Sequence, residues 1–154
     1  MDKIKEKIIT AGLKEAKKAF DEQEVPVGAV IFDTQTGTVI ATAHNKIVAT
    51  KDATAHAERL VISKACKKLK TDKLTGYSLF ATLEPCTMCA GAIALSRLDA
   101  VYYGAADPKT GGIEQGATVF SHPQTHHKPR VIENLNIPEC GTLLTEFFKS
   151  KRQK

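Results

Sequence analysis

Two short motifs in this chain carry residue types that bind metal ions and move protons. One is His-Ala-Glu at 56–58, and the other is Pro-Cys-Thr-Met-Cys at 85–89. Two cysteines three positions apart in the first turn of a helix lie on one face, so both sulfur atoms can reach one ion. Thiolates there face the positive end of the helix dipole, which favours the deprotonated form that binds metal. Cys86 and Cys89 are therefore predicted metal ligands.

His56 offers a third ligand from the start of a different predicted helix. Three protein ligands leave one tetrahedral position open, which is typical of a catalytic zinc site. A carboxylate beside zinc-bound water can accept a proton from it and later deliver that proton to a substrate nitrogen. Residues two apart on a regular helix do not face each other, so we expect His56 and Glu58 to converge only because both stand at the first turn. The motifs predict one Zn²⁺ per chain and Glu58 as the catalytic residue.

Each motif alone fits other chemistry. A Cys-x-x-Cys pair can be a redox couple, but this leaves Pro85 and the upstream His-Ala-Glu unexplained. A structural zinc site needs a fourth ligand, and the other two cysteines, Cys66 and Cys140, each stand alone in an apolar helical context typical of core thiols. His-x-Glu followed by Pro-Cys-x-x-Cys is the known signature of zinc-dependent nucleobase deaminases. The two motifs together therefore predict hydrolytic deamination.

Helices and strands around the motifs must position these side chains. Apolar periodicity predicts helices over 3–20, 56–69, 85–95 and 138–151, and strands over 27–32, 38–43, 78–82, 100–103 and 130–132. This order implies a mixed sheet with helices on both faces, and the two strand-helix-strand passages in the middle require parallel pairing. The polar segments 45–55 and 107–116 are predicted loops, and the second has the composition of a functional loop.

Length and charge set the wider limits. A chain of 154 residues suits one domain, 1–154. It has no apolar stretch near the roughly 18 residues of a membrane span, and its charged N-terminus is unlike a signal peptide, so we expect a cytoplasmic protein with no membrane partner. The net charge of +5 permits a polyanionic partner without requiring one. The basic residues gather at Lys64, Lys67, Lys68, Lys70 and Lys73, and at Lys149, Lys151, Arg152 and Lys154.

Several further stretches support a family resemblance. They lie at 24–30, 44–45, 54–58, 82–93, 96–97, 103–105, 107–111, 122–123, 139–140 and 147–148. On these residues the chain resembles the bacterial tRNA-specific adenosine deaminases, within the cytidine and deoxycytidylate deaminase superfamily, from about Glu24 onward. The Asp-x-Lys-Thr-Gly loop and the Phe-Phe pair are more specific to this branch than the zinc motifs. Ala53 replaces a common proline, and Ala106 replaces a common basic residue that could reach a phosphate.

The resemblance implies a three-layer α/β/α sandwich of the cytidine deaminase type, with a mixed, about five-stranded central sheet, and a homodimer. It implies conversion of adenosine to inosine at the wobble position of a tRNA anticodon stem-loop. It implies that Asn45 hydrogen-bonds the target base, that Asp107 contacts its sugar, that Ala57 and Glu84 line the pocket, and that Lys109 and the basic C-terminal helix approach RNA phosphates. Taken without the resemblance, Asn45 and Asp107 fit ordinary turn residues.

Two other functions stay open. A deaminase of a free nucleobase or nucleoside, of the guanine or cytosine type, would share the zinc ligands and the catalytic glutamate. A non-catalytic RNA-binding subunit on the same scaffold would be recognised by loss of that glutamate, but Glu58 is present. The three histidines of the late loop match no metal-ligand spacing, which favours a surface loop, and His44 at a strand end is predicted to be structural. Those three are His122, His126 and His127.

Overall fold

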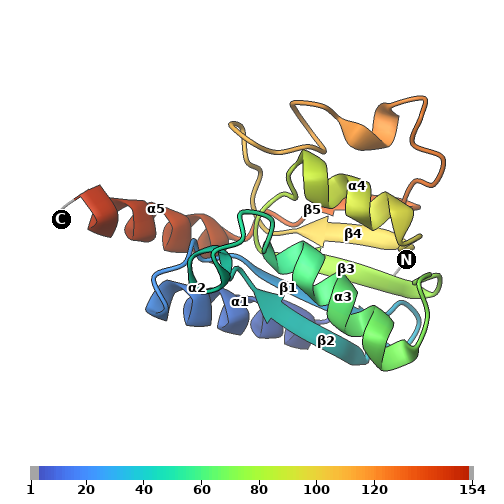
Figure 1. Cartoon of the computed structure of the whole chain (residues 1–154), viewed down its shortest axis with the longest axis horizontal. Helices are drawn as coiled ribbons and strands as arrows, with labels where there is room; N and C mark the ends of the chain where they lie inside the picture. The colour runs from blue at the N-terminus through green and yellow to red at the C-terminus, as the bar shows by residue number, and fades with distance from the viewer. Residues whose placement is uncertain (1–3, 153–154) are drawn as a thin grey trace.

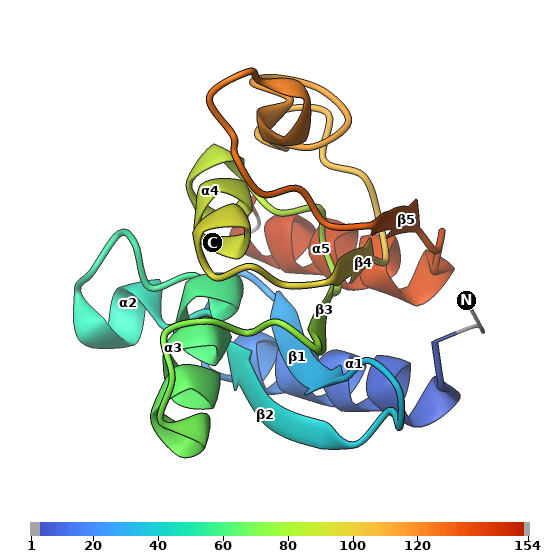
Figure 2. The same cartoon turned by 90° about the vertical axis from the view of Figure 1, so that its right-hand side faces the viewer.

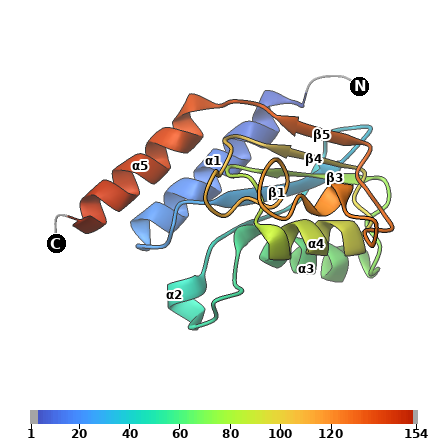
Figure 3. The ribbon, with the colours of Figure 1, turned by 90° about the horizontal axis from the view of Figure 1, so that it is seen from above.

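The computed structural model describes residues 4–152, and its helices and strands follow the predicted order. The helices are α1 (Glu6–Asp21), α2 (Ile47–Thr50), α3 (Ala57–Leu69), α4 (Thr87–Leu95) and α5 (Pro138–Arg152), with a 3-10 helix η1 (Val119–Ser121). The strands are β1 (Gly28–Asp33), β2 (Val39–His44), β3 (Tyr77–Ala81), β4 (Ala100–Tyr103) and β5 (Val131–Asn134). The strands form one sheet, with α1 and α5 on one side and α3 and α4 on the other (Figures 1 and 3). The predicted three-layer α/β/α sandwich is confirmed.

The strand order is β2-β1-β3-β4-β5, and β1 pairs antiparallel with both of its neighbours. The predicted parallel pairing is confirmed for β3 and β4, which α4 connects, and β4 and β5 are also parallel. The same prediction is wrong for β2 and β3, because β1 lies between them. The physical reason is burial. The first five residues of β1 are buried, whereas most of β2 is only partly covered, so β1 takes the interior position and β2 the edge.

Successive side chains of the strands pack on opposite faces of the sheet, as the period of two requires. Ile31 and Leu79 belong to the core cluster between the sheet and the α3–α4 layer. Their neighbours Val30 and Phe80 belong to the second cluster, under α1. The sheet is therefore covered on both faces. The end of the strands at which α3 and α4 begin carries the exposed loops.

Some boundaries differ from the sequence prediction by one or two residues, and these shifts concern the site directly. α3 begins at Ala57 and α4 at Thr87, so His56 and Cys86 are the N-cap residues that precede the two helices. The short helix α2 was not predicted within the polar loop. Its first amides are held by a residue far away in the sequence, because Glu24 accepts hydrogen bonds from the N–H groups of Val48 and Ala49 at 3.0 and 2.8 Å.

Within residues 4–152, none of the helices combines the length and the apolar character needed to cross a lipid bilayer. The C-terminal part of α5 extends past the end of the strands at which α3 and α4 begin (Figure 1). Phe147 of α5 packs edge-on against Phe20 of α1, with ring centroids 5.8 Å apart. The extended end of α5 therefore remains attached to the body of the protein through α1.

Candidate metal centre

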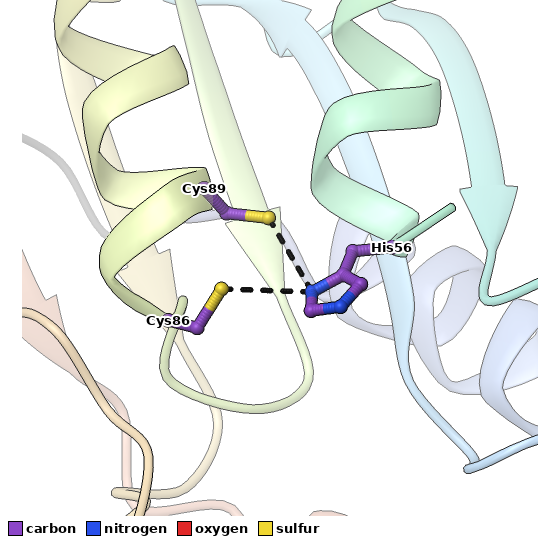
Figure 4. Close-up of side chains that lie close together, drawn as sticks. All are labelled: His56, Cys86 and Cys89. Carbon is purple, nitrogen blue, oxygen red and sulfur yellow. Dashed lines mark hydrogen bonds between the residues drawn. The ribbon is translucent and has the colours of Figure 1, made fainter. Parts of the chain in front are cut away.

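Three ligand side chains meet where α3 and α4 begin. The Nδ1 atom of His56 lies 3.5 Å from Sγ of Cys86 and 3.7 Å from Sγ of Cys89 (Figure 4). All three ligand atoms lie within 4.8 Å of one another. In the part of the chain that the structure describes, no other set of three histidine, cysteine or acidic side chains comes as close together. The structure thus brings together the three predicted metal ligands.

The spacing of these atoms matches a tetrahedral zinc ion. With Zn–S bonds of about 2.3 Å and Zn–N bonds of about 2.0–2.1 Å, a sulfur and a nitrogen ligand stand roughly 3.6 Å apart. The observed distances from Nδ1 of His56 to the two sulfur atoms are 3.5 and 3.7 Å. Two thiolates and one imidazole suit zinc, and three protein ligands leave a fourth position for water or substrate. The residues therefore fit a catalytic zinc ion.

Equivalent backbone positions in two helices explain how the ligands meet. His56 and Cys86 both have extended backbone, with φ and ψ of −79° and 148° for His56 and of −72° and 176° for Cys86. Cys89 follows in the first turn of α4 and is fully buried. Because α3 and α4 lie side by side on one face and start at the same edge, their N-caps face each other (Figure 4).

The protein stabilises negative charge at this site. A hydrogen bond from Cys89 lowers the pKa of Cys86 to about 4; burial opposes this shift and His56 adds to it. The same hydrogen bond, with burial, raises the pKa of Cys89 far above its usual range. Hydrogen bonding to Cys86 raises the pKa of His56, although burial opposes the change. The Cys86 thiolate makes the cluster a strong cation ligand, and a metal that binds here displaces the remaining thiol proton.

Glu58, the second residue of α3, has a side chain suited to proton transfer. It is 4% exposed, and burial raises its pKa to about 7. The charge of Cys86 contributes in the same direction, while that of His56 opposes it, so the carboxyl lies close to both ligands. Two residues of one helix at positions i and i+2 would point apart. His56 instead stands outside the helix as its N-cap, so helical spacing does not separate its side chain from that of Glu58. A carboxyl with a pKa near neutrality can both accept and return a proton.

Asn45 follows β2 and is buried beside the start of α3. Its Oδ1 accepts a hydrogen bond of 2.8 Å from the backbone N–H of Ala57, which orients the amide so that Nδ2 points elsewhere. Among residues 4–152 this Nδ2 group has no hydrogen-bond partner. It is not fully buried, so it can donate to a ligand. The Ala57 side chain is fully buried. The predicted contacts of both residues with substrate stay predictions.

Glu84 and Asp107 lie together, at the loop that follows β4. The Glu84 side chain is almost fully buried, and its carboxylate accepts the backbone N–H of Asp107 at 2.9 Å. The Asp107 carboxylate accepts the backbone N–H groups of Lys109 and Thr110, both at 3.1 Å, and the Thr110 hydroxyl at 2.6 Å. Lys109 is exposed. The structure thus brings three predicted substrate contacts together, Glu84 from the turn before α4 and Asp107 and Lys109 from the loop after β4, and their roles toward substrate stay predictions.

The other histidines and cysteines lie apart from this centre. His44 is buried between two carboxylates, with Nδ1 2.8 Å from Glu15 and Nε2 3.0 Å from Glu22, which fits the predicted structural role. Burial raises the pKa of Cys140 to about 12, which fits the predicted core thiol. Cys66 is only partly buried and packs against the edge of the core, and this burial raises its pKa as well.

The late loop holds its histidines separately. His127 Nε2 lies 2.9 Å from the carbonyl oxygen of Leu98, and His122 Nδ1 accepts the N–H of Gln124 at 3.1 Å. Together with His126, they form no metal-ligand group within residues 4–152. Their loop passes through η1 and lies beside α4 (Figure 2).

Sequence reasoning missed a contact that supports the loop after β4. The Tyr103 hydroxyl at the end of β4 donates to the carboxylate of Glu114, and Nδ2 of Asn134 lies 3.3 Å from the same oxygen. Each partner is an ordinary polar residue in its own segment, and only the fold brings them together. The one available signal is the glycine-rich composition of the loop, which indicates tight backbone packing.

Comparison with known proteins gives three kinds of match. Residues 2–105 match the family model described as the cytidine and deoxycytidylate deaminase zinc-binding region. The tRNA-specific adenosine deaminase of Agrobacterium fabrum is 46% identical over 140 residues, which cover 91% of each chain. A solved structure from a study of A-to-I editing by tRNA:A34 deaminases at the wobble position of transfer RNA is 44% identical. It covers 91% of this chain and 100% of that one, with a TM-score of 0.86. The guanine deaminase of Bacillus subtilis is 36% identical, covers 69% of this chain and 66% of that one, and has a TM-score of 0.61.

Proposed function

The chain belongs to the cytidine and deoxycytidylate deaminase family, and we propose that it converts adenosine to inosine at the wobble position of a tRNA anticodon. The observation that carries this proposal is the sequence identity over nearly the whole chain. Relatives named for tRNA adenosine deamination are 44–46% identical over 91% of it, whereas a guanine deaminase structure from Nitrosomonas europaea that covers the same share is 23% identical. The reaction replaces the amino group at C6 of adenine by oxygen and releases ammonia.

One zinc ion per chain is held by His56, Cys86 and Cys89. A zinc ion in such a site supplies Lewis acidity that activates a water molecule for attack. Glu58 takes one proton of that water at its carboxylate and delivers it to the adenine ring nitrogen. It then takes the second proton, from the new hydroxyl on C6, and passes it to the amine, which leaves as ammonia. Its burial raises the pKa of the carboxyl to about 7, which suits both directions of transfer.

Substrate contacts come from the loops around this centre. The free Nδ2 group of Asn45 donates to an acceptor on the target base, while Oδ1 stays with the backbone N–H of Ala57. Asp107 contacts the sugar of the target nucleotide. An anticodon loop already presents unpaired bases, so bringing one base into the site costs little.

RNA phosphates meet exposed basic side chains. Lys109 lies in the loop after β4, and the last turns of α5 carry Lys149, Lys151 and Arg152. The end of α5 extends past the end of the strands at which the metal centre lies. A bound RNA hairpin can therefore contact both Lys109 and the basic side chains of α5 (Figure 1). Lys154, which sequence analysis includes in the same cluster, lies outside the described residues. Because tRNA acts in the cytoplasm, a cytoplasmic location is part of the proposal.

A homodimer is supported by the outer face of α4. Met88 and Leu95 are exposed at 38% and 82%, respectively, and lie two helical turns apart on one face. Between them, an added Cβ at Gly91 would meet nothing within 4 Å, so the face is open as well as apolar. Exposed apolar faces of this kind mark protein interfaces. The occupant proposed here is α4 of a second copy.

Incubation with total tRNA, next to a panel of free bases and nucleosides, tests the proposal. We expect inosine in the tRNA, measured by nucleoside mass spectrometry, and no turnover of free guanine or cytosine. Turnover of a free base without inosine in the RNA would instead support the free-nucleobase alternative.

A further inference from the structure

Glu84 lies between the metal centre and the loop at 107–114. It stands two residues before Cys86, and its backbone N–H donates to the carbonyl of Ala105 at 2.8 Å. Its side chain is 2% exposed and points toward the loop at 107–114. Resting on the proposed function, we propose that Glu84 is a positioning residue. It fixes this loop against the ligand-bearing turn and sets the affinity for RNA without touching the substrate.

The contacts of the carboxylate carry this inference. One oxygen, Oε1, accepts the backbone N–H of Asp107 at 2.9 Å. The other, Oε2, accepts the backbone N–H groups of Ile113 and Glu114 at 3.0 and 2.8 Å. A carboxylate accepts about four hydrogen bonds, so three of its lone-pair positions are taken by the loop. Little capacity remains for a substrate, and both ends of the loop are attached to one side chain.

Glycines bring the loop backbone into direct contact with the turn that carries Cys86. Gly112 N–H donates to the carbonyl of Pro85 at 2.9 Å, and Gly111 forms a β-bridge with Cys86. An added Cβ at Gly111 would lie 2.5 Å from Oε2 of Glu84. At Gly112 it would lie 2.6 Å from the backbone nitrogen of Thr87. The Glu84 carboxylate therefore occupies the space beneath the loop, and residues with side chains do not fit at these two positions.

Two predicted substrate contacts depend on this attachment. The amide held by Oε1 belongs to Asp107, whose carboxylate in turn accepts the N–H of Lys109. Loss of the Glu84 contact frees the start of this turn, while the metal ligands stay at the starts of α3 and α4. RNA binding should therefore weaken more than the chemical step.

Amide hydrogen exchange of the zinc-loaded protein gives a readout independent of activity. In Glu84→Ala, we expect exchange at Asp107, Ile113 and Glu114 to become faster by about tenfold or more. In Glu84→Gln, the single side-chain oxygen can still accept the N–H groups of Ile113 and Glu114. The NH₂ group then faces the N–H of Asp107 and cannot accept a hydrogen bond from it. Exchange should then become faster at Asp107 alone.

Kinetics on an anticodon stem-loop RNA with adenosine at the wobble position complete the test. We expect KM to rise by about tenfold in Glu84→Ala and less in Glu84→Gln, with kcat within about threefold and one zinc per chain. Asp33→Ala is the matched control. Asp33 also accepts two backbone N–H groups, from Gln35 and Thr36 at 2.9 Å, but in the turn at the opposite end of β1, so KM should not change.

Unchanged exchange at the three amides in Glu84→Ala would overturn the inference. So would a collapse of kcat with unchanged KM and protected loop amides, because Glu84 would then act on the reaction itself. If Glu84→Ala does not fold, the selective effect of Glu84→Gln on Asp107 decides. If the wild-type protein leaves the hairpin unmodified, the proposed function fails, and the exchange data still decide the role of Glu84 in the loop.

Discussion

Glu58 combines burial with proximity to charged ligands. Burial alone favours the neutral carboxyl, and the thiolate of Cys86 adds to that preference, which together bring the pKa to about 7. A group that must first accept and then return a proton works best with a pKa near the working pH. The same side chain at an exposed position would be ionised at neutral pH and a poor proton donor. Burial at the start of α3 is therefore part of its catalytic role.

Replacing Glu58 by alanine removes the proton carrier but none of the three metal ligands. We expect kcat for deamination to fall by about 10²–10⁴, because general acid–base catalysis contributes that much. Metal analysis should still find one zinc per chain. The control is Glu6→Ala, which removes an exposed glutamate at the start of α1 and should leave kcat unchanged. A Glu58→Ala protein with near-normal kcat would show that another group moves the proton.

At the scale of helices and strands, N-caps assemble the site. His56 and Cys86 hold equivalent positions before α3 and α4, and the common packing of these helices on one face brings the caps together. The ligands could be predicted from the sequence because each motif is local to a helix start.

The position of β1 could not be predicted, because it depends on which strand is buried on both faces of the finished sheet. The contacts of Glu24 with α2 and of Glu84 with Ile113 were also beyond prediction. They join segments more than twenty residues apart through ordinary polar side chains. Glu84 was assigned to the pocket by resemblance, whereas its contacts became visible only in the fold.

The edge strand β2 is protected by lysines of α3. Lys64 and Lys68 donate to the carbonyls of Thr42 and Ile40 at 2.9 and 3.1 Å. Charges at an edge strand prevent pairing with other chains. In Lys64→Ala/Lys68→Ala we expect faster aggregation as concentration rises, measured by light scattering. Lys14→Ala/Lys17→Ala, which removes two exposed lysines from α1, should not change the rate. Equal rates for both double variants would contradict the account.

Glu15 joins α1 to β2 through His44 and should make stability depend on pH. Burial disfavours its ionised form, but hydrogen bonds from His44 and Lys18 outweigh it and lower the pKa of Glu15 below 4.5. A carboxyl with a lowered folded-state pKa stabilises the protein above its unfolded value, and this stability is lost as pH falls through the folded value. Glu15→Gln should therefore reduce the free energy of unfolding by about 2 kcal/mol at pH 7.

The deficit of Glu15→Gln should shrink as pH falls below about 4.5, measured by urea unfolding. Glu146→Gln on the exposed face of α5 is the control and should show no deficit. A deficit that stays constant down to pH 3 would mean that the Glu15 charge does not stabilise the fold.

At the scale of the whole molecule, the functional parts lie together at one end of the strands. The starts of α3 and α4, which hold the metal ligands, lie on this side together with the loop at 107–114 and the extended end of α5 (Figure 1). The exposed apolar side chains Met88 and Leu95 are on α4 as well. This arrangement suits a large, charged substrate more than a small base, because exposed cations stand beside the site.

The apolar face of α4 predicts the effect of a charge at the proposed dimer interface. Leu95→Asp places a carboxylate at the most exposed large apolar side chain of residues 4–152 and should give a monomer in sedimentation. Ile132→Asp, at an apolar side chain of β5 with 43% exposure, should leave the mass unchanged. If wild type and Leu95→Asp sediment alike, this face is not the interface.

Deamination of an anticodon stem-loop at increasing salt tests the central claim most directly. We predict inosine only at the wobble position. For about three phosphate contacts, RNA affinity should fall by about twenty- to fortyfold between roughly 50 and 200 mM salt. An unmodified hairpin, together with turnover of free guanine or cytosine at a KM that does not respond to salt, would contradict the account.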